Sequence, residues 1–130
     1  MKRFVLLVAI IAVGVAVPTA WACQCVRRQP TQLARQAAVV FTGSATSVSV
    51  RNGVTTARFA VTAAYKGRVR ARMVIRAPRT SCSFDFRQGK RYTVFAFESA
   101  GALQTNICSG TRMGAIRPAA FGLSARAILI

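Results

Sequence analysis

The chain of 130 residues contains no histidine and only two acidic residues, Asp85 and Glu98. General acid–base catalysis needs titrating side chains placed together, and these two carboxylates are the whole supply. Without histidine there is no Ser-His or Cys-His nucleophile and no imidazole ligand for a metal. The glycines form neither GxGxxG nor GxxxxGK, the loops that cradle phosphates. The sequence therefore predicts a protein that is not an enzyme and needs no cofactor.

The N-terminal hydrophobic run is also too short to span a membrane. It covers fourteen residues, Phe4 to Val17, whereas a span needs about 20. Lys2 and Arg3 precede it and Ala20-Trp21-Ala22 follows, which is the charged, apolar and small-x-small order of a secretory signal peptide. We therefore expect a secreted or extracytoplasmic protein whose mature chain begins at Cys23.

Lipid modification of Cys23 is the alternative to plain cleavage. A lipoprotein signal usually carries leucine before two small residues, whereas Trp21 here stands between two alanines. Plain cleavage is therefore favoured, and it leaves the amine of Cys23 free.

The composition is strongly basic, with 19 lysines and arginines and a formal net charge of +17. Removal of residues 1–22 takes away Lys2 and Arg3, which leaves 108 residues, 17 of them basic and 2 acidic, and a charge of +15. That length fits one domain, expected at 23–111, with 112–130 as a C-terminal tail. The charge predicts an acidic partner or surface, or alternatively a solvated basic surface that keeps the protein soluble.

Four cysteines remain in the mature chain, and an even number in an exported protein indicates two disulfides. They are Cys23, Cys25, Cys82 and Cys108. A zinc ion held by all four is not excluded by counting, but the oxidising compartment argues against it. We therefore expect no metal bound by the protein alone.

The apolar pattern predicts one short helix and then a β-hairpin. Residues 29–37 should be helical, with Pro30 at the first position. Val39–Val50 and Val54–Tyr65 should be strands, because Asn52-Gly53 suits a turn that needs positive φ twice. In the second strand alternation predicts one buried face, made of Ala57, Phe59, Val61, Ala63 and Tyr65, and one wet face, made of Arg58, Ala60, Thr62 and Ala64.

Three further strands are expected, at 68–77, at Arg91–Glu98 and at Leu103–Cys108. Five strands without a βαβ rhythm predict an all-β fold with a short helix, namely a five-stranded OB-like barrel stabilised by disulfides. A sandwich fits the pattern almost as well. A C-terminal helix from Pro118 to Ile130 should pack onto the barrel.

The backbone of Cys23 could itself bind a metal. A free α-amine and the carbonyl oxygen of the same residue can close a five-membered chelate ring, and an amine of pKa about 7.7 to 8.0 is partly neutral near pH 7. The metal must offer an open position, as catalytic zinc does. Bridges from Cys23 and Cys25 to distant strands would keep this chain end from fraying, although stability alone would also explain two disulfides.

The stretch CQCVRRQPTQ, a Cys-x-Cys pair followed by Val26 and Pro30, resembles the N-terminus of the tissue inhibitors of metalloproteinases. Residues 82–97, CSFDFRQGKRYTVFAF, and 103–111, LQTNICSGT, are similar to segments of that family and of the wider netrin-like modules. The resemblance extends over residues 23–111. It implies an OB-like barrel in which Cys23 is bonded to Cys82 and Cys25 to Cys108.

The resemblance also implies a function, the inhibition of zinc metalloendopeptidases. The amine and carbonyl of Cys23 would bind the zinc that the partner protease supplies and expel its water. Gln24 would enter the specificity pocket beside that zinc. The remaining inhibitory edge would be formed by Cys25, Val26, Thr80 and Ser81.

The chain departs from this family in ways that bear on partner and potency. Arg35 stands where the inhibitors carry a further cysteine, and Arg27 and Arg28 replace less charged residues. The short turn at Asn52-Gly53 leaves no long contact loop. The animal members of the family add a second disulfide-rich subdomain, which we do not expect here.

The basic charge supports a different hypothesis, a polyanion-binding module at the cell surface or envelope. Arg68, Arg70 and Arg72 would stand about 6.6 Å apart along one strand face. They could follow the acidic groups of a polysaccharide through bidentate contacts that weaken with salt. Nucleic acid is not expected as a partner after export. A third interpretation treats the domain as a scaffold for some other protein contact.

Overall fold

A computed structural model describes residues 10–14 and 23–130. Residues 10–14 carry no regular secondary structure, and the rest of the predicted signal peptide, with its cleavage site, lies outside the described residues. Among the described residues, no helix has the length and apolar character needed to cross a membrane.

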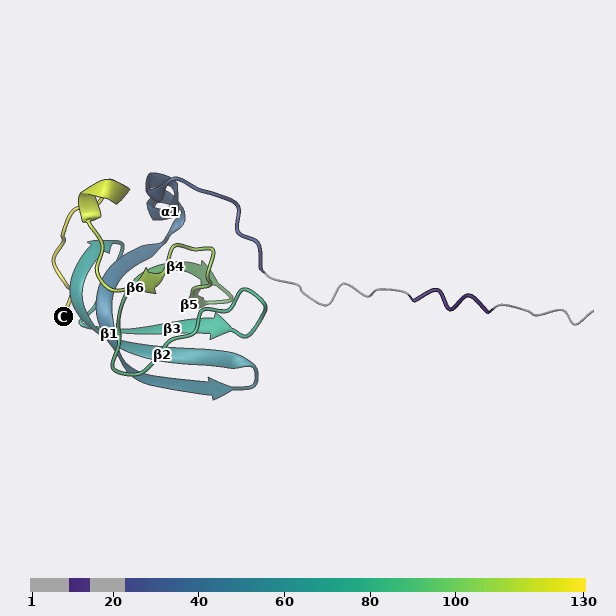
Figure 1. Ribbon diagram of the computed structural model, residues 1–130. Helices are drawn as coiled ribbons and strands as arrows, with labels where there is room; N and C mark the ends of the chain where they lie inside the picture. The colour runs from purple at the N-terminus through teal and green to yellow at the C-terminus, as the bar shows by residue number, and fades with distance from the viewer. Residues whose placement is uncertain (1–9, 15–22) are drawn as a thin grey trace, which may run out of the picture.

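Strands are the main regular secondary structure of the described chain (Figure 1). The elements are α1 (Pro30–Gln36), β1 (Val39–Arg51), β2 (Val54–Lys66), β3 (Arg72–Pro78), β4 (Arg91–Ser99), β5 (Ala102–Gln104), β6 (Arg112–Met113) and the 3-10 helix η1 (Pro118–Phe121). The strands pair in the order β1-β2-β3-β5-β4-β6, and β1 also pairs with β4, so that β1 to β5 close a ring. The predicted all-β, five-stranded architecture with a short helix is confirmed.

The hairpin of β1 and β2 forms as the sequence predicts. Asn52 and Gly53 have φ angles of 51° and 71°, so both turn residues adopt the left-handed conformation that such a turn requires. Inside the hairpin, Gly43 lets the two strands approach closely, because a Cβ atom there would lie 2.7 Å from the carbonyl oxygen of Ala60. The turn residues and Gly43 thus allow β1 and β2 to pair closely.

A bulge in β2 changes the predicted alternation. The register against β1 skips Thr62, which is an extra residue in β2, and such an insertion reverses the faces of the side chains that follow. Ala64 therefore packs inside the ring with Phe59, whereas Ala63 and Tyr65 pack outside it under α1. The prediction that the same alternating residues of β2 are buried along the whole strand is therefore wrong after Thr62.

Aromatic side chains fill the ring. The Phe59 ring meets Phe41 at 5.4 Å, Phe86 at 5.1 Å and Tyr92 at 6.4 Å between centroids, all in edge-to-face geometry. Phe86 comes from the loop between β3 and β4, whose backbone is anchored where Arg87 N donates to the Tyr92 hydroxyl at 2.7 Å. The loop that carries Cys82 is thereby tied to the core.

A second apolar cluster joins α1 to the outside of the sheet. It contains Ala34, Ala37, Val40, Tyr65, Phe95 and Phe121. Lys66 Nζ donates to the carbonyl oxygens of Ala34 and Arg35 at 2.9 and 3.0 Å, a favourable place for a cation at a helix C-terminus. The helix follows directly on the N-terminal segment, so this packing also positions Cys25 and its neighbours.

Three expectations about strand and helix limits are wrong. The strand predicted at 68–77 begins only at Arg72. The strand predicted at Leu103–Cys108 ends at Gln104, because Thr105 turns its hydroxyl inward to Phe95 O at 3.0 Å. The C-terminal helix is a single 3-10 turn that ends at Gly122, with φ 68°.

The segment 112–130 nevertheless packs onto the ring, as expected. β6 pairs with β4, and isolated bridges join Ala64 to Arg126 and Arg70 to Leu129. Ile128 packs against the main core.

Candidate functional site

Two disulfides tie the N-terminal segment to two distant loops. Cys23 is bonded to Cys82, in the loop between β3 and β4, with Cα atoms 5.0 Å apart. Cys25 is bonded to Cys108, in the loop after β5, with Cα atoms 5.1 Å apart. This is the pairing that the resemblance implies. The bridges span 59 and 83 residues of sequence, and closing loops of that length stabilises the fold by roughly 4 kcal/mol each in the chain-entropy model.

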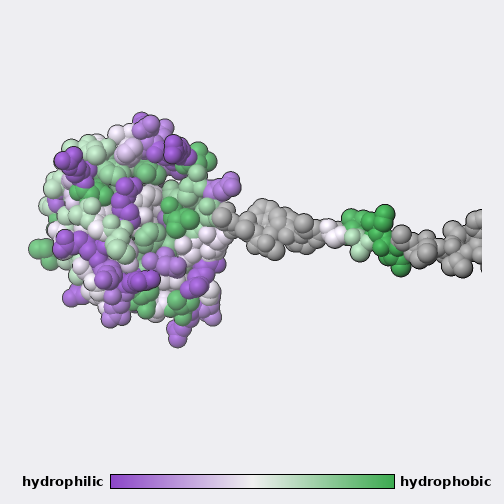
Figure 2. All heavy atoms as spheres, in the orientation of Figure 1, coloured by the Kyte–Doolittle hydropathy of each residue, from purple (hydrophilic) through white to green (hydrophobic). Residues whose placement is uncertain are grey.

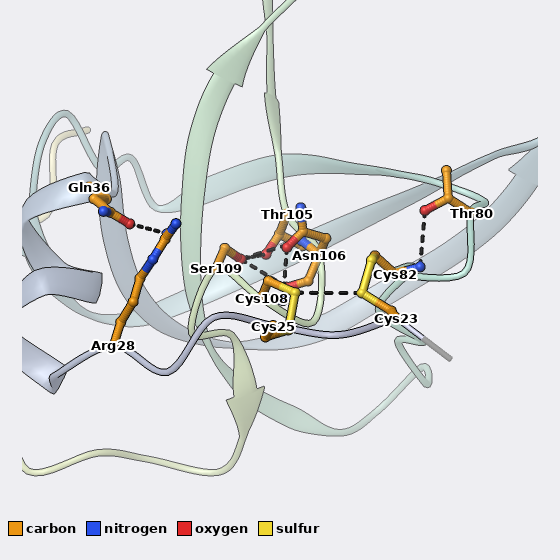
Figure 3. The surroundings of a disulfide bond; sticks show 10 residues. All are labelled: Cys23, Cys25, Arg28, Gln36, Thr80, Cys82, Thr105, Asn106, Cys108 and Ser109. Atoms are coloured by element: carbon orange, nitrogen blue, oxygen red, sulfur yellow. Dashed lines mark hydrogen bonds between the residues drawn. A yellow bond between two sulfur atoms is a disulfide. The ribbon is translucent and has the colours of Figure 1, made fainter. Parts of the chain in front are cut away.

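The two bridges lie against each other (Figure 3). Cys23 Sγ is 3.6 Å from Cys108 Sγ, and the sulfur atoms of Cys23, Cys82 and Cys108 all lie within 4.8 Å of one another. None of the cysteines is free, whereas a metal would need thiolates. The cluster is thus a pair of disulfides, in keeping with an oxidising compartment.

The loop with Cys82 is held in a tight turn. Cys82 N donates to Thr80 Oγ1 at 3.1 Å, and Ser83 N donates to Thr80 O at 3.1 Å. Ile107 N donates to Cys82 O at 2.9 Å and so connects this loop to the one that bears Cys108. Both anchors of the N-terminal segment are therefore joined to each other through the backbone.

The loop with Cys108 is fixed from inside the fold. Cys108 N donates to Asn106 Oδ1 at 2.8 Å, a local side-chain turn of the kind asparagine favours. Thr105 and Thr111 are buried and share a hydrogen bond, and Thr105 also donates to Phe95 O in β4. The bridge from Cys25 thus ends on a loop that is hydrogen-bonded to a central strand.

The predicted inhibitory residues gather on this edge of the molecule. Cys23 is half-buried, whereas Gln24, Cys25, Thr80 and Ser81 are exposed. Val26 is 76% exposed. The structure brings all six onto the N-terminal segment and the turn that its first bridge reaches.

Ile107 is a neighbour that the sequence analysis missed. Its side chain is 43% exposed, and it lines a hollow of about 290 Å³ together with Val26, Leu33 and Thr111. Its backbone bond to Cys82 places it beside the two bridges. The only signal in the sequence is its position next to Cys108.

Arg27, Arg28 and Arg35, where the sequence departs from the resemblance, are all exposed. Arg28 donates to the side chain of Gln36 and so turns back toward α1 (Figure 3). Arg35, at the position where the inhibitors in the resemblance carry a further cysteine, lies in the last turn of α1. The helix therefore has no covalent link of its own and depends on apolar contacts and on Lys66.

The structure does not place Arg68, Arg70 and Arg72 along one strand. Arg72 is the first residue of β3, and the other two precede it. Val69 is buried between them, and Arg70 N donates to Met73 Sδ at 3.5 Å. All three arginines are exposed, but they do not form the regular row that the alternation predicts.

The two carboxylates are exposed and separate. Asp85 lies in the loop between β3 and β4, and Glu98 lies near the end of β4. Within residues 23–130 neither forms an ion pair with lysine or arginine.

Comparison with models of known protein families gives no match for this chain, and comparison with curated proteins also gives none.

Proposed function

We propose that the mature protein is a secreted, non-catalytic inhibitor of zinc metalloendopeptidases that binds the protease zinc through the amine and carbonyl oxygen of Cys23. The observation that supports this most is the contact between the two disulfides. They anchor residues 23 and 25 to two different loops, and Gln24 is exposed between these two residues.

Chelation by a chain terminus requires that the terminus be rigid. A flexible dipeptide would lose conformational freedom on binding, whereas a preorganised one avoids most of that cost. Cleavage before Cys23 would free the amine, and the carbonyl oxygen of the same residue supplies the second donor. A catalytic zinc keeps one position for water or substrate, which is the position these two atoms would take.

Specificity would come from the residues around the chelate. Gln24 would extend into the pocket beside the zinc, and Cys25 and Val26 would continue along the cleft. Thr80 and Ser81 stand on the turn that Cys82 closes, and Ile107 adds an apolar contact beside Val26. Exposed apolar groups next to a rigid anchor are typical of an inhibitory interface.

A purely stabilising role would also explain the two disulfides. The test must therefore separate inhibition from stability. The oxidised protein with a free Cys23 is compared with a protein that carries one additional alanine before Cys23, on a panel of zinc metalloendopeptidases. We expect inhibition of at least one protease by the first protein, a loss of more than a hundredfold in the second, and the same melting temperature. Equal potency of the two proteins would refute chelation, and no inhibition of any panel member would refute the proposed function.

A further inference from the structure

The outer face of the sheet formed by β1, β2 and β3 carries four arginines that the inhibitor function does not use. In β3, exposed Arg72, Val74 and Arg76 alternate with buried residues that face the core. Arg58 of β2 is paired with Val74. Its side chain therefore lies diagonally between Arg72 and Arg76, at a Cα spacing of about 7 to 8 Å from each.

Arg51 extends this face onto β1. Ser49 is paired with Thr56, which is paired in turn with Arg76. Because side chains two residues apart on a strand share a face, Arg51 and Ser49 point to the same side of the sheet. We call Arg51, Arg58, Arg72 and Arg76 the arginine face.

Within residues 10–14 and 23–130, these guanidinium groups have no protein partner. All four are exposed, and among the described residues none of their side chains donates a hydrogen bond or forms an ion pair. Glu98 is paired with Leu103, which packs on the core. Directly paired side chains lie on the same face of a sheet. Glu98 is therefore on the core side of the sheet, and Arg76 is on the outer side. Like charges held on rigid strands repel one another, and a bound anion would relieve that repulsion.

The arrangement favours an extended ligand over a single anion. Arg72 and Arg76 are four residues apart on one strand, about 13 Å, and Arg58 stands between them. Each guanidinium can bind a carboxylate or sulfate through two parallel hydrogen bonds. The side chains between the arginines are small, and three of them carry hydroxyls that can form hydrogen bonds with a sugar. These residues are Ser47, Ser49, Thr56 and Ala60.

A lipid surface fits this face less well. Binding to a membrane usually needs several apolar side chains that enter the bilayer, and the exposed large apolar residue in this row is Val74, at 42% exposure. The surface in Figure 2 likewise mixes hydrophilic and hydrophobic residues where the hairpin and β3 lie.

We propose that the arginine face binds a linear acidic polysaccharide. Together with Arg72, the residues that contact this ligand are Arg58 and Arg76 and not Arg68 and Arg70.

β3 connects this face to the inhibitory edge. The strand ends at Pro78, and Arg79 N then donates to Gly53 O at 2.8 Å, just before Thr80 and Cys82. A polysaccharide on the arginine face would therefore hold the protein at a matrix or envelope while the edge stays exposed. The binding does not depend on inhibition, and each can fail without the other.

The experiment compares the triple variant R58Q/R72Q/R76Q with the charge-matched control R87Q/R117Q/R126Q, whose arginines are exposed elsewhere. Dextran sulfate and polygalacturonate serve as sulfated and carboxylated probes, and phosphatidylglycerol vesicles serve as the lipid probe. We expect more than tenfold weaker binding of the triple variant to at least one polysaccharide, with a shallower salt dependence, and less than threefold weakening in the control. The double variant R68Q/R70Q should behave like the control.

Three results would overturn the proposal. An equal loss in the triple variant and the control would mean that net charge alone is responsible. No loss in the triple variant would mean that the site lies elsewhere. Tighter binding to the vesicles than to both polysaccharides would make a lipid surface the ligand. Circular dichroism and melting of each variant confirm that the comparison is between folded proteins.

Discussion

Cys23 Sγ lies 3.6 Å from Cys108 Sγ, although 85 positions separate the two residues. They belong to different disulfides, so the contact joins both bridges into one unit beneath the N-terminal segment. The segment 23–25 is anchored at each end and has Gln24 as its exposed middle. This unit fixes residues 23–25 to the rest of the fold.

Removal of one bridge separates stability from inhibition. The double variant C25S/C108S keeps the bond from Cys23 to Cys82, and we expect it to lose about 2 to 5 kcal/mol of unfolding free energy. At a temperature where circular dichroism shows it fully folded, its inhibition constant should still rise more than tenfold, because residues 24 and 25 are no longer held. A folded variant with unchanged potency would show that this bridge serves stability alone.

Gln24→Ala tests the residue expected in the specificity pocket. Because Gln24 is exposed, the melting temperature should stay within about 1 °C, while inhibition of the preferred protease weakens roughly tenfold, about 1.4 kcal/mol. Gln88→Ala is the matched control, since Gln88 is an exposed glutamine in the loop between β3 and β4. Similar inhibition by both variants would remove Gln24 from the interface.

Ile107→Glu tests the apolar contact that we propose for Ile107. Ile107 and Val74 are almost equally exposed, at 43% and 42%, but only Ile107 lies beside the bridges. We expect Ile107→Glu to weaken inhibition more than tenfold, because a charge would be desolvated at the interface, and Val74→Glu to weaken it less than twofold. The reverse order would place the protease contact on the arginine face.

Zinc ligation by the Cys23 amine would make inhibition depend on pH. Zinc binds the neutral amine, and an ordinary α-amine has a pKa of about 7.7 to 8.0. Below that range a proton must leave on binding, so the inhibition constant should rise about tenfold for each pH unit below 7 and level off above 8. An inhibitor of the same protease without a titrating group gives the protease's own profile. A flat ratio between the two inhibitors from pH 6 to 8 would contradict amine ligation.

Local signals in the sequence predicted a large part of this fold. Asn52-Gly53 fixes its turn through two adjacent residues, and Pro30 marks the start of α1, so neither depends on distant contacts. The pairing of Cys23 with Cys82 came from the resemblance, because spacing alone cannot give disulfide connectivity.

The features that were missed depend on contacts across the sheet. Simple alternation cannot reveal the bulge at Thr62, because β1 imposes it through its own register. Arg58 and Arg76 are eighteen positions apart and meet only through the pairing of β2 with β3. β6 forms by pairing with β4, and β5 ends where Thr105 donates to Phe95 O. A one-dimensional pattern shows neither contact.

The central claim is that two backbone atoms of Cys23 enter the coordination sphere of the protease zinc. The most direct measurement replaces that zinc with Co²⁺ in a protease that the protein inhibits, and records the visible spectrum as the inhibitor is added. We predict a change in the cobalt bands with the free Cys23 amine and no change with the protein that carries an added alanine. An unaltered spectrum at full inhibition would contradict the claim, because the protein would then block the cleft without touching the metal.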